Sequence, residues 1–338
     1  MIRFNRIIVF FSIIVIASFY MQAQDSYNYK MKTIGKHDDE ALGTFVNSNN
    51  SMFATCSVDE TIKLWSLPEG KELFTLSGHL GEVNNISFSG NDRWLASGST
   101  DQTIKIWDIK TGKEVETLRG HTDQVIGVYF SQDSASTFLA STSFDKTVKL
   151  WDVRLGTEIK TLHGHTASIN NVAYSYDGKY LASCSDDKTI KIWSTDLSTK
   201  TPLITLTGHD APVLTVVYSF DSKKLASSDQ SGNVIIWSMP DGQIIQKFKA
   251  HNDLIQDVSF AEDNIRLVSG SLDKKVKLWD SNTGKNLMTF DAGVEVWSVD
   301  LVSDANIITL ACADGTVRLL VNTKNEKINK KAGKGGRK

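Results

Sequence analysis

The chain has 338 residues, of which 41% are hydrophobic and 9% aromatic, enough apolar material for one large core or two ordinary ones. Residues 24–322 carry 28 Lys or Arg against 38 Asp or Glu, whereas residues 323–338 carry seven Lys or Arg against Glu326. An acidic body of this kind argues against a protein built to neutralise nucleic acid. The basic tail at 323–338 has the composition of a disordered segment.

The first 23 residues have the pattern of an export signal. The basic stretch MIRFNR precedes a 14-residue apolar run at 7–20, which is short for a membrane-spanning helix. Cleavage is expected after Ala23 or after Ala17, giving a periplasmic or extracellular protein. The alternatives are an uncleaved membrane anchor and, if the start codon is placed too early, a cytoplasmic protein. Contact with a membrane is expected only through this segment, if it stays uncleaved.

A tryptophan and a histidine recur in phase through the body of the chain. The tryptophan ends strand-like strings such as TIKLW and TVKLW, at successive intervals of 42, 44, 42, 44 and 42 residues. A seventh string, GTVRLL, places Leu320 where the next tryptophan belongs. Each repeat holds four short runs of β-branched and aromatic residues separated by turn sequences. Four strands every 40–45 residues are typical of a propeller blade.

The repeats resemble the WD40 family, whose Gly-His and Trp-Asp pairs occur here as Gly78-His79, Gly120-His121, Trp107-Asp108 and Trp151-Asp152, among other copies. The resemblance covers residues 27–321. It implies an all-β, seven-bladed β-propeller of residues 24–322, with four antiparallel strands per blade, as a monomer. Residues 27–34 resemble a fourth strand without a blade, and the seventh repeat lacks its fourth strand. We therefore predict that the N-terminal strand closes the ring by joining the last blade, which hides both open edges.

The well-formed repeats each contain a His, a Ser or Thr, and an Asp, the residue set of a hydrolase. A catalytic site needs one copy beside an oxyanion hole, whereas complete sets recur five times. In the family that the repeats resemble, these residues and the repeat tryptophan form a hydrogen-bonded chain that holds the loops. We therefore predict structural tetrads and no enzymatic activity. The tetrad residues are His37, Thr55, Asp59, Trp65; His79, Ser97, Asp101, Trp107; His121, Ser141, Asp145, Trp151; His165, Ser183, Asp187, Trp193; His209, Ser227, Trp237; and His251, Ser269, Asp273, Trp279.

Two repeats depart from this pattern. The fifth has Ser231 at the acid position, with Asp229 two residues earlier, so its tetrad is predicted to lack the turn aspartate. The seventh is predicted to have no tetrad and to be ordered by apolar packing and by the closing strand. Its residues at the His, Ser, acid and Trp positions are Gly293, Leu310, Asp314 and Leu320.

Three cysteines, Cys56, Cys184 and Cys312, lie at nearly equivalent repeat positions, far apart in sequence and within predicted core strands. Buried thiols are expected there rather than disulfides. The spacing of His and Cys does not resemble a zinc site, so neither a metal nor a cofactor is predicted.

Propellers of the family that the chain resembles use the face formed by the loops between blades and the turns between second and third strands. We carry the family's contact positions over to this sequence by their place in the repeat. A protein or peptide partner is then expected to contact the residue five positions after each histidine and the residue just before each turn aspartate. Apolar members would ring the channel mouth, with Trp297 as an anchor. The alternative for Trp297 is inward packing in the space left by the missing tetrad. The predicted contacts are Trp297, Phe144, Ile126, Leu214, Leu272, Leu42, Val58, Asn84, Asn170, Gln256 and Asp186.

The leading hypothesis is therefore a non-catalytic scaffold for a protein or peptide partner. The alternative is a ligand-binding or enzymatic propeller with its site in the central channel, which would need convergent carboxylates or a metal. The positions expected near the channel supply mostly Asn, Ser and apolar residues, which favours the scaffold. Nucleic acid is not expected as a partner.

Overall fold

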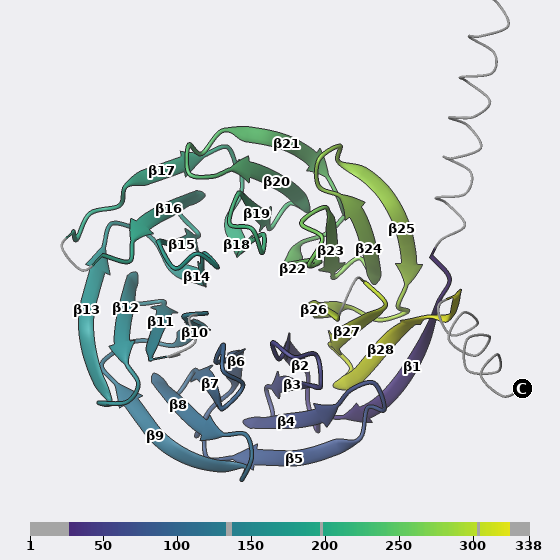
Figure 1. Cartoon of the computed structure of the whole chain (residues 1–338), viewed down its shortest axis with the longest axis horizontal. Helices are drawn as coiled ribbons and strands as arrows, with labels where there is room; N and C mark the ends of the chain where they lie inside the picture. Colours follow the sequence, from purple (N-terminus) through teal and green to yellow (C-terminus); the bar gives the residue numbers. More distant parts are fainter. Residues whose placement is uncertain (1–26, 133–136, 197–198, 303–304, 325–338) are drawn as a thin grey trace, which may run out of the picture.

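The structure is a computed structural model that describes residues 27–132, 137–196, 199–302 and 305–324. These residues form seven four-stranded antiparallel sheets arranged around a central channel (Figure 1). Each sheet is one blade, with its first strand innermost. The predicted seven-bladed all-β propeller is confirmed.

The strands of blades 1 to 6 follow one another in sequence. The innermost strands, including that of blade 7, are β2 (Ala41–Val46), β6 (Val83–Phe88), β10 (Val125–Phe130), β14 (Ile169–Tyr174), β18 (Val213–Tyr218), β22 (Ile255–Phe260) and β26 (Val296–Val302). The second strands are β3 (Met52–Ser57), β7 (Trp94–Ser99), β11 (Phe138–Ser143), β15 (Tyr180–Ser185), β19 (Lys224–Asp229), β23 (Arg266–Ser271) and β27 (Ile307–Cys312). The third strands are β4 (Thr61–Ser66), β8 (Thr103–Asp108), β12 (Thr147–Asp152), β16 (Thr189–Ser194), β20 (Asn233–Ser238), β24 (Lys275–Asp280) and β28 (Thr316–Asn322). The outermost strands are β5 (Glu72–Ser77), β9 (Lys113–Arg119), β13 (Thr157–His163), β17 (Ile204–Thr207), β21 (Ile244–Lys249), β25 (Lys285–Asp291) and β1 (Tyr29–Lys36).

The N-terminal strand closes the ring, as predicted. In Figure 1, β1 lies outside β28, and the two strands pair antiparallel from Tyr29 opposite Asn322 to Lys36 opposite Thr316. The pairing continues past the strand ends, where the backbone N–H of Thr323 donates to the carbonyl of Asn28 at 2.9 Å. An unpaired β28 would leave a row of open N–H and C=O groups, so this closure removes the exposed sheet edge.

Apolar side chains between neighbouring blades form the core. The repeat tryptophans are the largest members; Trp65, Trp151 and Trp193 are each 1% exposed. The period-2 alternation of each strand places one face of a sheet against the blade before it and the other against the blade after it. The three cysteines are free and buried in these layers, as expected, and burial raises the pKa of each thiol.

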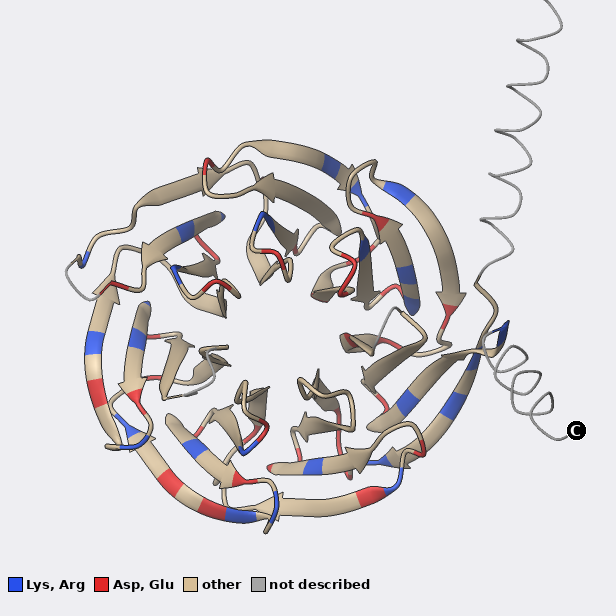
Figure 2. Ribbon diagram, in the orientation of Figure 1, with Lys and Arg blue, Asp and Glu red and all other residues tan. Residues whose placement is uncertain are grey.

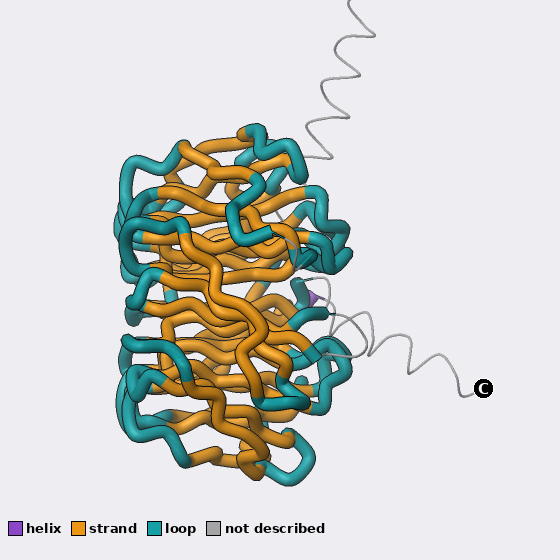
Figure 3. Tube along the Cα trace, turned by 90° about the vertical axis from the view of Figure 1, so that its left-hand side faces the viewer, coloured by secondary structure: helices purple, strands orange, loops and turns teal. Residues whose placement is uncertain are grey.

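Loops gather on two opposite sides of the ring (Figure 3). We call the side that carries the loops between blades and the turns between second and third strands the top face, and the opposite side the bottom face. Of the regions beyond the propeller, residues 1–26 and 325–338 lie outside the described residues, so the predicted signal and most of the basic tail remain predictions. Among the residues that the structure describes, no helix is long and apolar enough to cross a membrane.

Candidate interaction face

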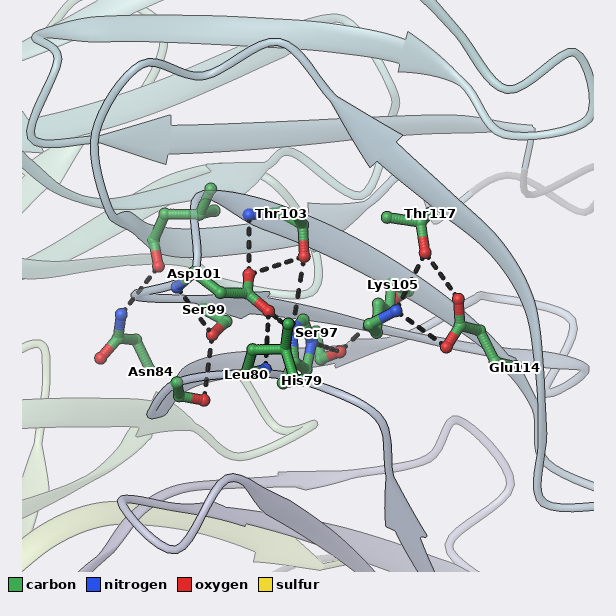
Figure 4. A network of polar contacts seen from close by, with 12 residues as sticks. His79, Leu80, Asn84, Ser97, Ser99, Asp101, Thr103, Lys105, Glu114 and Thr117 are labelled. Carbon is green, nitrogen blue, oxygen red and sulfur yellow. Dashed lines mark hydrogen bonds and ion pairs between the residues drawn. The ribbon is translucent and has the colours of Figure 1, made fainter.

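Blade 2 shows how one tetrad holds the top face (Figure 4). The Trp107 indole N–H donates to Ser97 Oγ at 2.9 Å, and Ser97 Oγ lies 2.7 Å from His79 Nε2. His79 Nδ1 lies 2.8 Å from Asp101 Oδ2. Because a carboxylate only accepts hydrogen bonds, the imidazole proton is assigned to Nδ1, and Nε2 accepts from the serine hydroxyl. The hydroxyl thus donates to His79, accepts from Trp107 and is fully buried, so it is shielded from solvent.

The acid of the tetrad joins two loops. Asp101 accepts the backbone N–H of Leu80 at 3.0 Å in the loop between blades, and the N–H and hydroxyl of Thr103 at 2.9 and 2.6 Å beyond the turn. Burial alone would raise the pKa of Asp101, but the hydrogen bonds from His79, Thr103 and Leu80 outweigh it and hold the pKa well below its usual range. The carboxylate is therefore charged, and it pins both loops of the blade.

The same chain of contacts recurs in all the other predicted tetrads. His Nε2 lies 2.7 to 2.9 Å from the Ser or Thr hydroxyl, and the indole N–H donates to that hydroxyl at 2.8 to 2.9 Å. Burial lowers the pKa of His251 to about 4 although Asp273 opposes this shift, so this imidazole is neutral at pH 7. A neutral imidazole held between a hydroxyl and a carboxylate suits a structural role.

Blade 5 corrects one expectation. Its tetrad does have an acid, since His209 Nδ1 lies 2.8 Å from Asp229 Oδ2. Asp229 takes the place of the serine that ends the second strand in blades 1 to 4 and 6, and its longer side chain reaches the imidazole. It also accepts the backbone N–H of Ser231 and of Asn233, each at 2.9 Å, so it holds its own turn from the inside. The prediction that this tetrad lacks its acid was wrong because the acid was sought only at the turn position, which Ser231 occupies here.

Blade 7 lacks a tetrad, as predicted, but a polar clamp takes its place. Arg318 Nη2 lies 2.7 Å from Asp314 Oδ2 in the turn, and Arg318 Nη1 donates to the carbonyl of Ala292 at 2.8 Å in the loop between blades. Nε of the same guanidinium donates to Thr316 Oγ1 at 2.6 Å. The expectation that apolar packing and the closing strand alone order this blade is therefore incomplete.

In each of blades 1 to 6, the residue five positions after the histidine is the second residue of the innermost strand, at the channel mouth. Trp297 occupies the same position in blade 7. All seven residues are half-buried: Leu42, Asn84, Ile126, Asn170, Leu214, Gln256 and Trp297. Trp297 does not pack fully inward, because its indole N–H donates to Glu40 Oε2 at 2.8 Å on the top loop of blade 1. This bond joins the two blades at the seam and holds the indole at the mouth.

The two asparagines of this ring have inter-blade contacts. Asn84 Nδ2 donates to the carbonyl of Val125, and Asn170 Nδ2 to that of Val213, each at 2.9 Å. Asn170 also donates to Asp186 Oδ1 at 2.8 Å. Part of the hydrogen-bonding capacity of these residues is therefore used in joining neighbouring blades.

The expected apolar ring is less exposed than its sequence positions suggested. Val58 and Leu272 are half-buried in the turns, and Phe144 is 36% exposed. A second large apolar side chain on the top face, Leu80, is 87% exposed and was missed because it directly follows the histidine. Further exposed apolar side chains lie at the bottom face: Phe138, Leu155, Phe220 and Ile265.

The family described as WD domain, G-beta repeat matches residues 29–66, 70–108, 112–152, 156–194, 200–238 and 242–280. The chain belongs to the WD40-repeat family. The first matched repeat joins β1, the fourth strand of blade 7, to the three inner strands of blade 1. Each WD40 repeat here thus straddles two blades, and β1 closes the ring because of this offset.

Three relatives illustrate how far the similarity reaches. The chain is 34% identical over 88 residues to the WD repeat-containing protein 89 homolog of Dictyostelium discoideum, which is 26% of this chain and 23% of that protein. It is 36% and 38% identical over 77 residues to the ribosome biogenesis protein BOP1 homologs of Drosophila grimshawi and Drosophila persimilis, which is 23% of this chain and 10% of each relative. The chain thus matches less than a quarter of the length of each of these relatives.

The WD40 channel differs from the sequence expectation in one respect. Asp257 on β22 and Asp300 on β26 both line it, although mostly Asn, Ser and apolar residues were expected there. The alternation of the innermost strands signals them, because both occupy channel-facing positions between the buried valines and other core residues of β22 and β26. Within the described ranges no group of three or more His, Cys, Asp or Glu is placed to hold a metal ion.

Proposed function

We propose that this WD40 propeller is a non-catalytic scaffold that binds a protein or peptide on its top face. The observation that carries the proposal is the loop clamp repeated around one face: six His–Asp tetrads and the Arg318–Asp314 pair of blade 7. Loops that are ordered before a partner arrives lose less entropy on binding. The central hydroxyls of the tetrads are fully buried, out of reach of a substrate, which favours a structural role over nucleophilic catalysis.

The centre of the proposed contact is the seam between blades 7 and 1. Trp297 offers a large half-buried ring whose polar edge is already occupied by Glu40, so its remaining surface is free to contact an apolar group. Leu42 on blade 1 and Leu272 on blade 6 add half-buried apolar side chains on the top face of the two neighbouring blades. An aromatic anchor surrounded by smaller apolar groups is the usual composition of an interaction hot spot.

The charge of the top face favours a partner that carries basic residues. The loops between blades carry the exposed acids Asp38, Asp39, Glu82, Asp123, Asp210 and Asp253, and the turns add Glu60 and Asp186 against Lys146, Lys188 and Lys274. Many of the other basic positions lie on the third and outer strands (Figure 2). Complementary charge between this acidic face and a basic partner raises the association rate. The same acidic charge disfavours nucleic acid on this face.

Partner capture with matched variants tests the binding face. The double variant Trp297→Ala with Phe144→Ala is expected to lose the partners that the wild-type chain captures. The control, Leu155→Ala, removes a side chain that is 71% exposed at the bottom face and is expected to keep them. An unchanged set of partners in a folded double variant would falsify the proposed face.

The compartment is proposed separately. We infer export through residues 1–23, which supports a periplasmic or extracellular partner. The same scaffold acting inside the cell is the alternative, and the similarity to relatives named for ribosome biogenesis favours it. N-terminal sequencing of the mature protein after cell fractionation distinguishes the two, since cleavage after Ala23 or Ala17 is expected only for the exported form.

A further inference from the structure

The bottom end of the channel holds a cavity of about 170 Å³ with an aromatic wall. Phe45 and Tyr129 meet edge to face at 5.7 Å between ring centroids, and Tyr176 stacks on Phe220 at 4.5 Å. A hydrogen bond joins the Tyr129 and Tyr176 side chains, which links the two pairs. These rings come from blades 1, 3, 4 and 5, and all four line the cavity; together we call them the aromatic wall.

The same cavity is also lined by the carboxylates of Asp257 and Asp300, and by the exposed Glu262. Asp257 and Asp300 come from blades 6 and 7, and the charge of Asp300 is close enough to raise the pKa of both Tyr129 and Tyr176. Among the described residues that line the cavity there is no Lys or Arg. Burial raises the pKa of Asp257 to about 7 and also raises that of Asp300, as expected for carboxylates without a cationic partner.

A structural role alone does not account for these charges. Asp257 Oδ2 accepts the backbone N–H of Val299 at 3.3 Å, and Asp300 Oδ2 accepts that of Val46 at 2.8 Å, so each joins its blade to the next. Blade 2 makes the equivalent bonds with neutral groups. There Asn85 Oδ1 accepts from Val128 at 3.2 Å, and Ser87 Oγ accepts from Phe130 at 3.1 Å. Since an amide or hydroxyl suffices, these two half-buried carboxylates carry a desolvation cost that the blade contacts do not require.

We propose that this cavity binds a small organic ammonium ion, with the carboxylates of Asp257 and Asp300 facing its charge and the aromatic wall facing its carbon atoms. Aromatic faces attract cations through their quadrupole, and desolvated sites strengthen the attraction. The volume limits the ligand, because a cavity of about 150 Å³ holds one benzene molecule. A choline-sized group or the end of a lysine side chain fits this limit, whereas a folded peptide segment does not. The site is independent of the top face.

Calorimetric titration of the full chain with choline tests the proposal. The neutral isostere 3,3-dimethylbutan-1-ol has the same shape without the charge and is expected not to bind. Asp257→Asn and Asp300→Ser introduce the residues that blade 2 carries at the same positions, so each keeps a blade-joining acceptor while removing the charge. Each variant is expected to weaken choline binding about tenfold, the effect of ~1.4 kcal/mol.

The control Glu82→Gln removes an exposed acid of the top face and is expected to leave the affinity unchanged. Phe220→Ala, at a ring that is 39% exposed, tests the aromatic wall should an acid variant fail to fold. Titrations with butylamine and with a peptide containing one lysine distinguish a free amine from a lysine side chain as the source of the ammonium group. Binding of either probe supports the site. No binding of choline, butylamine or the peptide at millimolar concentration would overturn the proposal. Equal affinity of choline for wild type and both acid variants, or for choline and its isostere, would also overturn it.

Discussion

Removing the central hydroxyl of one tetrad is expected to destabilise the propeller by a predictable amount. In Ser97→Ala, the indole N–H of Trp107 and Nε2 of His79 both lose their partner, at 2.9 and 2.7 Å, and both side chains are buried. A buried polar group left without a hydrogen bond costs about 1–3 kcal/mol. Two such groups, partly relieved by relaxation, predict a loss of ~2–4 kcal/mol in the free energy of unfolding.

Urea denaturation followed by tryptophan fluorescence and by circular dichroism measures this loss, and agreement between the two probes checks that unfolding is two-state. Ser131→Ala is the matched control, because Ser131 is 6% exposed and its hydroxyl has no hydrogen-bond partner among the described residues. The control is expected to change the free energy by less than ~0.5 kcal/mol. If Ser97→Ala were no more destabilising than Ser131→Ala, the tetrads would not be structural units.

Further predictions concern the seam and the channel. Arg318→Met removes the clamp of blade 7 and is expected to lower the free energy of unfolding, measured by urea denaturation, by ~1–2 kcal/mol. Lys63→Met, at the equivalent position of blade 1, removes the Lys63–Glu72 pair and is expected to lower it by less than ~1 kcal/mol. Equal losses in the two variants would argue against the clamp. The pKa of Asp257 is raised in the folded state to about 7, with Asp300 as the charged group facing it, so the folded protein holds the extra proton and stability should fall as pH rises from about 4 to about 7. The lowered pKa values of His251 and Asp101 act in the opposite direction in both proteins, so the difference between them isolates Asp257. Between pH 4 and pH 7 the wild type should lose on the order of 1–2 kcal/mol of its free energy of unfolding relative to Asp257→Asn, and identical profiles would contradict this. Thr142→Val removes a fully buried hydroxyl without a described partner and is expected to raise the free energy of unfolding by up to ~1 kcal/mol in the same assay, whereas a loss would show that the hydroxyl is satisfied.

The fold could be predicted from the sequence because the blade is a local unit. Four strands separated by short turns recur every 41 to 44 residues, and six of the seven repeats carry the tryptophan and histidine that mark their place. Ring closure followed from counting strands, since residues 27–34 had no blade and the last blade lacked one strand. These inferences required no knowledge of contacts between blades.

What the sequence did not predict depends on contacts or on the reach of side chains. Asp229 was assigned no role because it lies two residues before the usual acid, although an aspartate at the end of a buried strand already indicated a special function. Asp257 and Asp300 were overlooked because the channel positions were judged by general composition and not by the alternation of the innermost strands. The exposure of the mouth residues depends on packing between blades, which the register of one blade does not give.

Amide hydrogen exchange of the full chain, alone and with a captured partner, tests the central claim of a top-face scaffold most directly. The account predicts slower exchange on binding in the loops between blades and in the turns after the second strands, strongest around Glu40 and Trp297 at the seam. Slower exchange confined to the bottom loops or the outer strands would contradict it.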